Sequence, residues 1–118
     1  MAIEERASGA VVILDIEGRM TIESRTDLLL PDRVRRLLQE GRKQFLLNLE
    51  GVRYVDTSGL CDLVEAYVTT TRQGGSLKLL HLTERVRYLL VITKLLTVLE
   101  AYESEADAVA SFGPGAPA

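Results

Sequence analysis

The first structured segment that the hydropathy pattern predicts is a β-strand at residues 10–17. Its sequence, Ala-Val-Val-Ile-Leu-Asp-Ile-Glu, is rich in β-branched residues and partly alternates between apolar and polar positions. Gly18 is expected to end the strand. Residues 3–7 are predicted to form a preceding edge strand, and the polar stretch 18–26 is predicted to be a loop.

An amphipathic helix is expected next, because apolar residues recur at helical spacing. The positions are Leu30, Val34, Leu37 and Leu38. Pro31 suits the first turn, where a missing N–H costs nothing, and Gly41 follows as a stop signal. The pattern leaves open whether the helix begins earlier, near Asp27, with a kink.

The middle of the chain repeats this order of strand and helix. Residues 44–49 form a short, nearly continuous apolar run, which is typical of a buried central strand. A second helix ends at Gly74-Gly75, and residues 76–82 predict another strand. The apolar stripe of that second helix comprises Leu60, Leu63, Val64, Tyr67, Val68 and Thr71.

The last third of the chain predicts a helix, a strand and a helix. The third helix carries Val86, Leu89, Leu90 and Thr93 on one side, and residues 97–102 form a short last strand. Ser104 can cap a final helix that runs to Phe112. The prediction is one α/β domain over residues 1–112, with a mostly parallel or mixed sheet, and a flexible tail at 113–118.

Composition narrows the function more than the fold. Of the 118 residues, 47% are hydrophobic and 26% are charged, which is ordinary for a globular domain. One cysteine, Cys61, excludes an internal disulfide, and one histidine, His81, excludes a two-histidine metal site. The net charge of −3 and the absence of tryptophan argue against binding to nucleic acid. No cofactor is expected.

The same features predict a soluble cytoplasmic protein that does not enter the membrane. The N-terminal residues include Glu4, Glu5 and Arg6 and lack the apolar core of a signal peptide. No apolar run is longer than that at residues 88–92, which is far shorter than the ~18–20 residues that span a bilayer.

The segment that suggests chemistry is Tyr54-Val-Asp-Thr-Ser-Gly-Leu60, between a strand and a helix. Ser58 is expected at the helix N-terminus, where unpaired backbone N–H groups and the helix dipole favour an anion. A phosphate on Ser58 would bring a charge of about −1.5 to −2 into that field, although Asp56 would oppose it. The alternative is that Asp56, Thr57 and Ser58 serve only as a helix cap.

Three enzymatic or signalling alternatives use the same residues. The Asp-Thr-Gly of aspartic proteases is interrupted here by Ser58, and a nucleophile elbow lacks its first and last glycine. A response-regulator receiver would use Asp56 as its phosphorylated residue. It would also need an acidic pair after the first strand and a lysine closing a late strand, and neither Asp15 with Glu17 nor Lys94 fits. No general base is available, so the chain is not expected to be an enzyme.

The chain resembles the STAS domain of anti-sigma factor antagonists from about residue 10 to residue 112. The resemblance is carried by Asn48-Leu-Glu-Gly-Val-Arg-Tyr-Val-Asp-Thr-Ser-Gly-Leu60, a helix, Gly74-Gly75, an apolar strand and Val86-x-x-Leu-Leu90. Gly18-Arg-Met20 and Thr93-x-Leu95 also match, although Met20-Thr21 stands where many members have Leu-Asp. The resemblance implies a four- or five-stranded mixed sheet with about four helices, mainly on one face.

The resemblance also implies bacterial transcription regulation by partner switching. The unphosphorylated protein would bind an anti-sigma factor serine kinase and release a sigma factor. The kinase, using ATP that it binds itself, would phosphorylate Ser58 and end the interaction. Thr57 offers a second hydroxyl beside it. The expected partner-binding residues are Arg19, Met20, Thr21, Asp56, Thr57, Ser58, Gly59, Leu60 and Cys61.

A second function remains open within the same fold. The chain would then be a STAS adaptor in a signalling or lipid-transport assembly, without phosphorylation. In either case a monomer or a weak dimer is expected.

Overall fold

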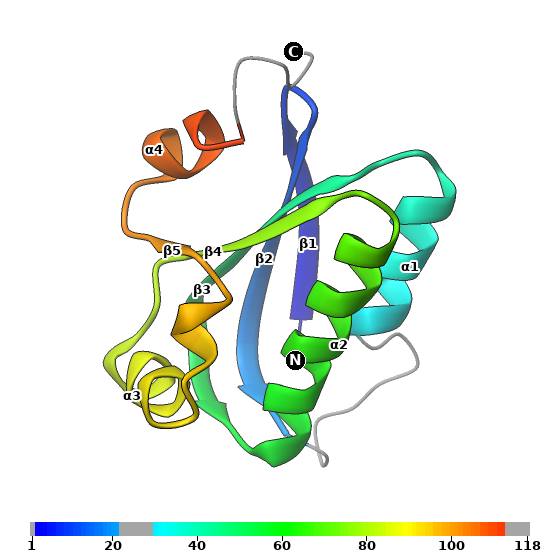
Figure 1. Ribbon diagram of the computed structural model, residues 1–118. Helices are drawn as coiled ribbons and strands as arrows, with labels where there is room; N and C mark the ends of the chain where they lie inside the picture. Colours follow the sequence, from blue (N-terminus) through cyan, green and yellow to red (C-terminus); the bar gives the residue numbers. More distant parts are fainter. Residues whose placement is uncertain (1, 22–29, 113–118) are drawn as a thin grey trace.

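The computed structural model describes residues 2–21 and 30–112, and its centre is a five-stranded sheet. The strands lie in chain order: β1 (Ala2–Ser8), β2 (Val11–Met20), β3 (Gln44–Val55), β4 (Ser76–Leu80) and β5 (Ala101–Tyr102). β1 pairs antiparallel with β2, and every other pair is parallel (Figure 1). The mixed sheet and the N-terminal edge strand are therefore confirmed.

Three of the four helices in the described residues cover one face of the sheet (Figure 1). They are α1 (Leu30–Gln39), α2 (Thr57–Arg72) and α3 (Glu84–Ile92). α4 (Glu105–Ala110) packs on the opposite face, and a short 3-10 turn, η2 (Leu95–Thr97), follows α3. This arrangement confirms the predicted α/β fold, with helices mainly on one side.

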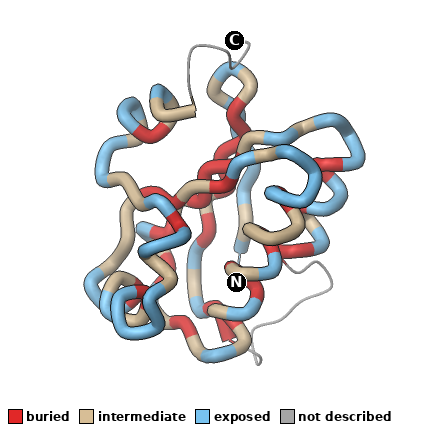
Figure 2. The backbone as a smooth tube through the Cα atoms, viewed as in Figure 1, coloured by how far each residue is buried: buried red, intermediate tan, exposed pale blue. Residues whose placement is uncertain are grey.

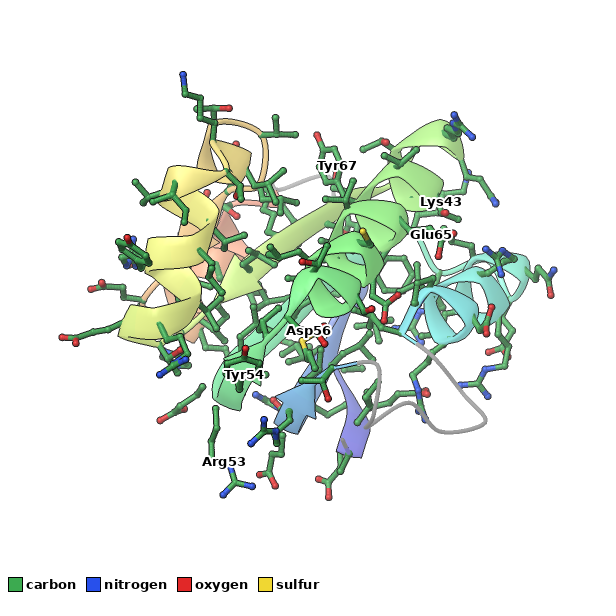
Figure 3. All side chains as sticks on the ribbon, turned by 90° about the horizontal axis from the view of Figure 1, so that it is seen from below. Lys43, Arg53, Tyr54, Asp56, Glu65 and Tyr67 are labelled. Atoms are coloured by element: carbon green, nitrogen blue, oxygen red, sulfur yellow. The ribbon has the colours of Figure 1, made fainter. Side chains whose placement is uncertain are left out.

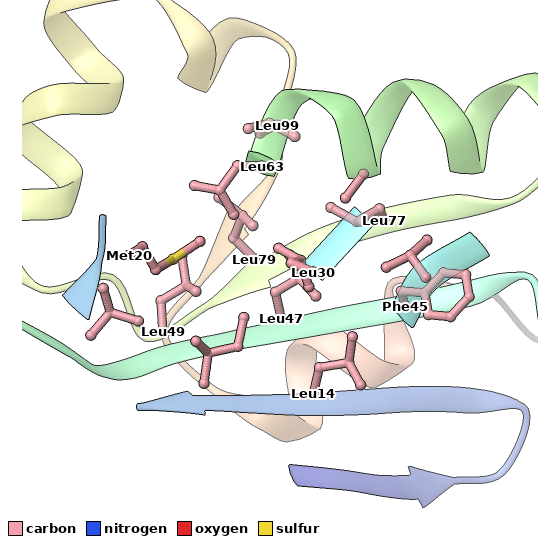
Figure 4. Packing of buried hydrophobic residues seen from close by; sticks show 14 of the residues in the cluster. Leu14, Met20, Leu30, Phe45, Leu47, Leu49, Leu63, Leu77, Leu79 and Leu99 are labelled. Carbon is pink, nitrogen blue, oxygen red and sulfur yellow. The ribbon is translucent and has the colours of Figure 1, made fainter. Parts of the chain in front are cut away.

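The alternation of side chains along β2 explains why the domain has two cores of unequal size. Leu14 and Ile16 point to the large core, which α1, α2 and α3 cover, and Figure 4 shows its packing around Leu47. Ile13 points to the small core beneath α4. Figure 2 shows the buried residues following the strands and the sides of the helices that face them.

Two strands continue past their predicted ends. Gly18 does not end β2, because its backbone adopts φ 103° at an irregularity in the pairing with β3, and the strand resumes to Met20. A glycine tolerates such a bulge without the steric cost of a side chain. β3 continues from the predicted 44–49 to Val55 because β2 continues beside it. The remainder of the predicted 18–26 loop, the Asp27 helix start and the tail at 113–118 lie outside the described residues.

The predicted strand at 97–102 is wrong over most of its length. Lys94 adopts a left-handed conformation with φ 62°, and η2 occupies residues 95–97. Only Ala101 and Tyr102 pair with β4. The predicted strand at 76–82 is also too long, since β4 ends at Leu80 and His81 has a positive φ of 54°.

The largest difference from expectation is the rotation of α2 about its axis. Of the predicted apolar stripe, only Leu63 is fully buried, whereas Leu60, Val64 and Val68 are half-buried. The buried residues of α2 are instead Gly59, Asp62, Leu63, Ala66 and Thr70. Small side chains such as Gly59 and Ala66 let α2 lie close to the strands, and Val64 and Val68 remain partly exposed.

Candidate functional site

The candidate site is the junction between β3 and α2, and Asp56 organises it. Its backbone is extended, with φ −101° and ψ −172°, and its carboxylate accepts a 3.0 Å hydrogen bond from the N–H of Gly59. Its own N–H donates to the carbonyl oxygen of Met20 at 3.2 Å. Asp56 therefore caps α2 and also fastens the helix start to the end of β2.

Gly59 brings the first turn of α2 directly onto β2. A Cβ atom at this position would overlap the carbonyl oxygen of Met20 and would lie 2.8 Å from both the Met20 Cβ and a Val55 methyl group. No side chain larger than hydrogen fits there without movement of the backbone. The glycine of the Asp-Thr-Ser-Gly motif is therefore required by the packing of α2 on β2.

Ser58 and Thr57 lie on the first turn of this helix. Thr57 is exposed and Ser58 is half-buried. Neither hydroxyl makes a hydrogen bond to any residue that the structure describes. The first turn of a helix leaves backbone N–H groups without helical partners, so the two hydroxyls stand in a positive local field.

A surface groove of about 850 Å³ runs along the outer side of α2 from Thr57 to Arg72. The half-buried apolar residues of the rotated helix form its floor, and α1 and the segment after α3 contribute to its walls. Its lining residues are Arg35, Thr57, Leu60, Cys61, Asp62, Val64, Glu65, Val68, Thr69, Arg72, Thr93 and Leu95. The hydroxyl-bearing turn therefore opens onto a partly apolar surface.

The structure gathers the predicted partner-binding residues at one end of the molecule but buries some of them. Met20, Thr21 and Gly59 are buried, so they support the surface from beneath. Asp56, Ser58 and Leu60 are half-buried, and Arg19, Thr57 and Cys61 are exposed.

One feature of this end was not predicted from the sequence. The guanidinium carbon of Arg19 lies 5.0 Å from the centroid of the Tyr54 ring, and that of Arg85 lies 5.2 Å from it. Figure 3 views the molecule from this end, with Tyr54 and Asp56 labelled near the start of α2. Tyr54 and Arg85 are 31 positions apart, and no local pattern signals their contact.

The chain is an α/β domain built on a mixed sheet, with a serine in the first turn of α2. Comparison with models of protein families shows the family to which such a domain belongs. The STAS domain model matches residues 2–108. The chain therefore belongs to the STAS domain family. No curated protein sequence matches it.

Solved structures with the same fold include regulators and a transporter-family protein. An anti-sigma factor antagonist from Mycobacterium paratuberculosis has a TM-score of 0.80 at 14% identity, over 93% of this chain and 92% of that one. The Bacillus cell fate determinant SpoIIAA in its phosphorylated form has a TM-score of 0.70 at 14% identity, over 95% of this chain and 100% of that one. A sulfate transporter family protein from Wolinella succinogenes has a TM-score of 0.70 at 22% identity, over 86% of this chain and 84% of that one.

None of these likenesses reaches 25% identity, so they establish the shared fold and leave the activity to be argued from the site. Within the described residues, no helix combines the length and the apolar character needed to cross a bilayer.

Proposed function

We propose that this STAS domain is an anti-sigma factor antagonist that is switched off by phosphorylation of Ser58. In its unphosphorylated form it binds an anti-sigma factor that is also a serine kinase, and a sigma factor is released. The partner binds ATP and transfers its terminal phosphoryl group to the Ser58 oxygen. The chain itself is a substrate and a regulator, not an enzyme, and it acts in the cytoplasm.

The observation that carries this proposal is the state of the Ser58 hydroxyl. It lies in the first turn of α2, half-buried and without a hydrogen-bond partner among the described residues. A purely structural serine at this place would be expected to cap the helix, but Asp56 already does so. The hydroxyl is therefore available for modification.

The surroundings explain how a phosphate would change binding and preserve the fold. Backbone N–H groups and the helix dipole favour an anion by about 0.3–1 kcal/mol at such a site. In a complex, the same phosphate would be desolvated beside the groove that begins at Thr57. A loss of about 3 kcal/mol in binding would lower the affinity more than a hundredfold.

Incubation with the cognate kinase and ATP tests the modification itself. Intact-mass measurement should show one addition of about 80 Da, the mass of a phosphoryl group. Ser58→Ala should abolish the addition, and Thr57→Ala is the matched control that should retain it. The same addition on the Ser58→Ala chain would refute the assignment to Ser58.

A second function within the fold is a non-phosphorylated adaptor in a signalling or transport assembly. The likeness to a sulfate transporter family protein motivates it. An adaptor would bind its assembly with equal affinity before and after treatment with kinase and ATP. Loss of binding only when Ser58 is phosphorylated would exclude the adaptor.

A further inference from the structure

We infer that Arg19 and Arg85, stacked on Tyr54, form a docking site for an acidic segment of a protein partner. The inference deepens the proposed function and rests on it for the view that this end of the domain meets a partner. It adds the chemistry of the partner surface: carboxylates that pair with the two guanidinium groups, next to an apolar side chain.

The geometry of the stack prepares both arginines for such a ligand. The three residues come from β2, β3 and α3, and both guanidinium carbons lie within 5.2 Å of the Tyr54 ring centroid. A guanidinium that rests on a ring keeps its N–H donors at its edge, in a planar fork that fits a carboxylate. Because the ring restrains both side chains, less conformational entropy is lost on binding.

Unlike most other arginines that the structure describes, Arg19 and Arg85 have no carboxylate partner within the described part of the chain. Five other arginines contact a carboxylate at 2.6–3.5 Å, namely Arg6, Arg33, Arg35, Arg36 and Arg87. The protein as a whole carries a net charge of −3, so its own acidic groups are in excess. Arg19 and Arg85 nevertheless place two positive charges beside one ring, and carboxylates bound there would offset them.

A shallow pocket beside the stack indicates the kind of acidic segment. It has a volume of about 490 Å³, and Tyr54, Val55, Tyr88 and Leu89 form its largely apolar wall. Tyr88 is 65% exposed. Glu84 also lines this pocket and disfavours a continuous polyanion such as nucleic acid. A peptide that carries a carboxylate next to a leucine or an aromatic side chain could pair with the guanidinium groups and also fill the apolar pocket.

The position of the stack links it to the Ser58 turn. Arg19 is the register partner of Tyr54 at the ends of β2 and β3, and the next residue, Met20, accepts the hydrogen bond from Asp56. The stack and the helix start therefore share one end of the domain (Figure 3). An acidic segment bound there would be repelled by a phosphate on Ser58, which gives the switch an electrostatic basis.

The test titrates the full chain with a twelve-residue peptide of four Glu-Leu-Asp repeats and follows backbone amide chemical shifts. The peptide should shift the signals of Arg19, Tyr54 and Arg85, and a Gln-Leu-Asn repeat should not. Arg19→Ala/Arg85→Ala should weaken binding at least tenfold. Arg19→Lys/Arg85→Lys should lose part of the affinity, because lysine keeps the charge without the planar fork.

The matched control is Arg42→Ala/Lys43→Ala, which removes the same charge from two basic residues outside the α2 groove that also have no described carboxylate partner. Its affinity for the acidic peptide should stay within twofold of wild type. Equal losses in both double variants would overturn the inference, since bulk charge alone would then explain binding. Tighter Arg19- and Arg85-dependent binding to phosphatidylserine vesicles or duplex DNA would also overturn it.

No kinase or phosphorylated chain enters this titration, so its outcome is independent of the mass measurement at Ser58. Failure of the peptide to bind would remove the acidic docking site and leave the phosphorylation proposal standing. If the peptide binds but Ser58 is not phosphorylated, the acidic docking site stands and the phosphorylation proposal is refuted.

Discussion

Asp56 links three parts of the site through one residue: the end of β2, the end of β3 and the first turn of α2. Its side chain satisfies the Gly59 N–H, and its backbone bonds to Met20. Replacing it with alanine should destabilise the domain by about 0.5–2 kcal/mol, the usual effect of losing an N-cap. Urea unfolding would measure this. Asp56→Asn is the control, and it should retain most of the stability because asparagine also caps helices.

Gly59 makes a second prediction at this scale, because two effects act in opposite directions. Alanine in place of a helical glycine is favoured by about 1 kcal/mol of helix propensity. Its Cβ would, however, overlap the Met20 carbonyl oxygen. The cost of displacing the backbone should exceed the gain in helix propensity, and Gly59→Ala should lower the free energy of unfolding by about 1–3 kcal/mol.

The comparison for Gly59 is Thr57→Ala, at an exposed position of the same turn, which should change stability by no more than about 0.5 kcal/mol. If Gly59→Ala were as stable as wild type or more so, the close approach of α2 to β2 would be wrong.

At the scale of single residues, the sequence predicts well what is decided locally. The start of α2 at the Asp-Thr-Ser-Gly turn follows from capping preferences within four residues, and the structure confirms it. The Arg19–Tyr54–Arg85 stack was not predictable, because α3 brings Arg85 to Tyr54 only when the whole sheet is assembled.

At the scale of elements, the order of strands and helices was predictable from periodicity, but the orientation of α2 was not. Hydrophobic periodicity favours the stripe that contains Leu60, Val64 and Val68 as the buried side. Close packing on the sheet instead selects the side with Gly59, Ala66 and Thr70. Thr70 can be buried because its hydroxyl donates to the Ala66 carbonyl oxygen at 2.8 Å.

The rotation of α2 predicts opposite effects for two adjacent apolar residues. Leu63 is fully buried, so Leu63→Ala should cost about 2–5 kcal/mol of folding stability. Val64 lines the outer groove, so Val64→Ser should cost much less, about 1 kcal/mol or below, while weakening binding to the proposed anti-sigma factor partner. Urea unfolding and a binding titration on each variant measure the two effects. Equal destabilisation would mean that α2 has the orientation expected from hydrophobicity.

At the scale of the whole molecule, Arg6 ties the sheet to α4 on its second face. It contacts Asp15 on β2 and Glu105 on α4, each at 2.6 Å. The hydrogen bonds from Arg6 lower the pKa of both carboxyl groups below their ordinary values. A lowered folded-state pKa stabilises the fold above the unfolded pKa of about 4, and this contribution disappears as the pH falls through the folded-state pKa.

Stability should therefore fall less steeply with acid in Arg6→Met than in wild type. Because Arg6 and Glu105 are 43% and 40% exposed, solvent screening limits the difference to about 1 kcal/mol. Urea midpoints between about pH 6 and pH 2 measure it. Arg53→Met, at an exposed arginine without a described ion pair, is the control and should follow the wild-type profile. Parallel profiles for wild type and Arg6→Met would contradict the role of Arg6.

The overall arrangement gives the molecule one end where a serine hydroxyl, a groove along α2 and an arginine pair lie together. The proposed regulatory function depends on the serine acting as the switch. The decisive measurement is the affinity of the anti-sigma factor for the wild-type chain before and after enzymatic phosphorylation, with Ser58→Ala treated in parallel. We expect the wild-type affinity to fall more than a hundredfold and that of Ser58→Ala to stay constant. Unchanged wild-type affinity after complete phosphorylation, or an equal loss in Ser58→Ala, would contradict the account.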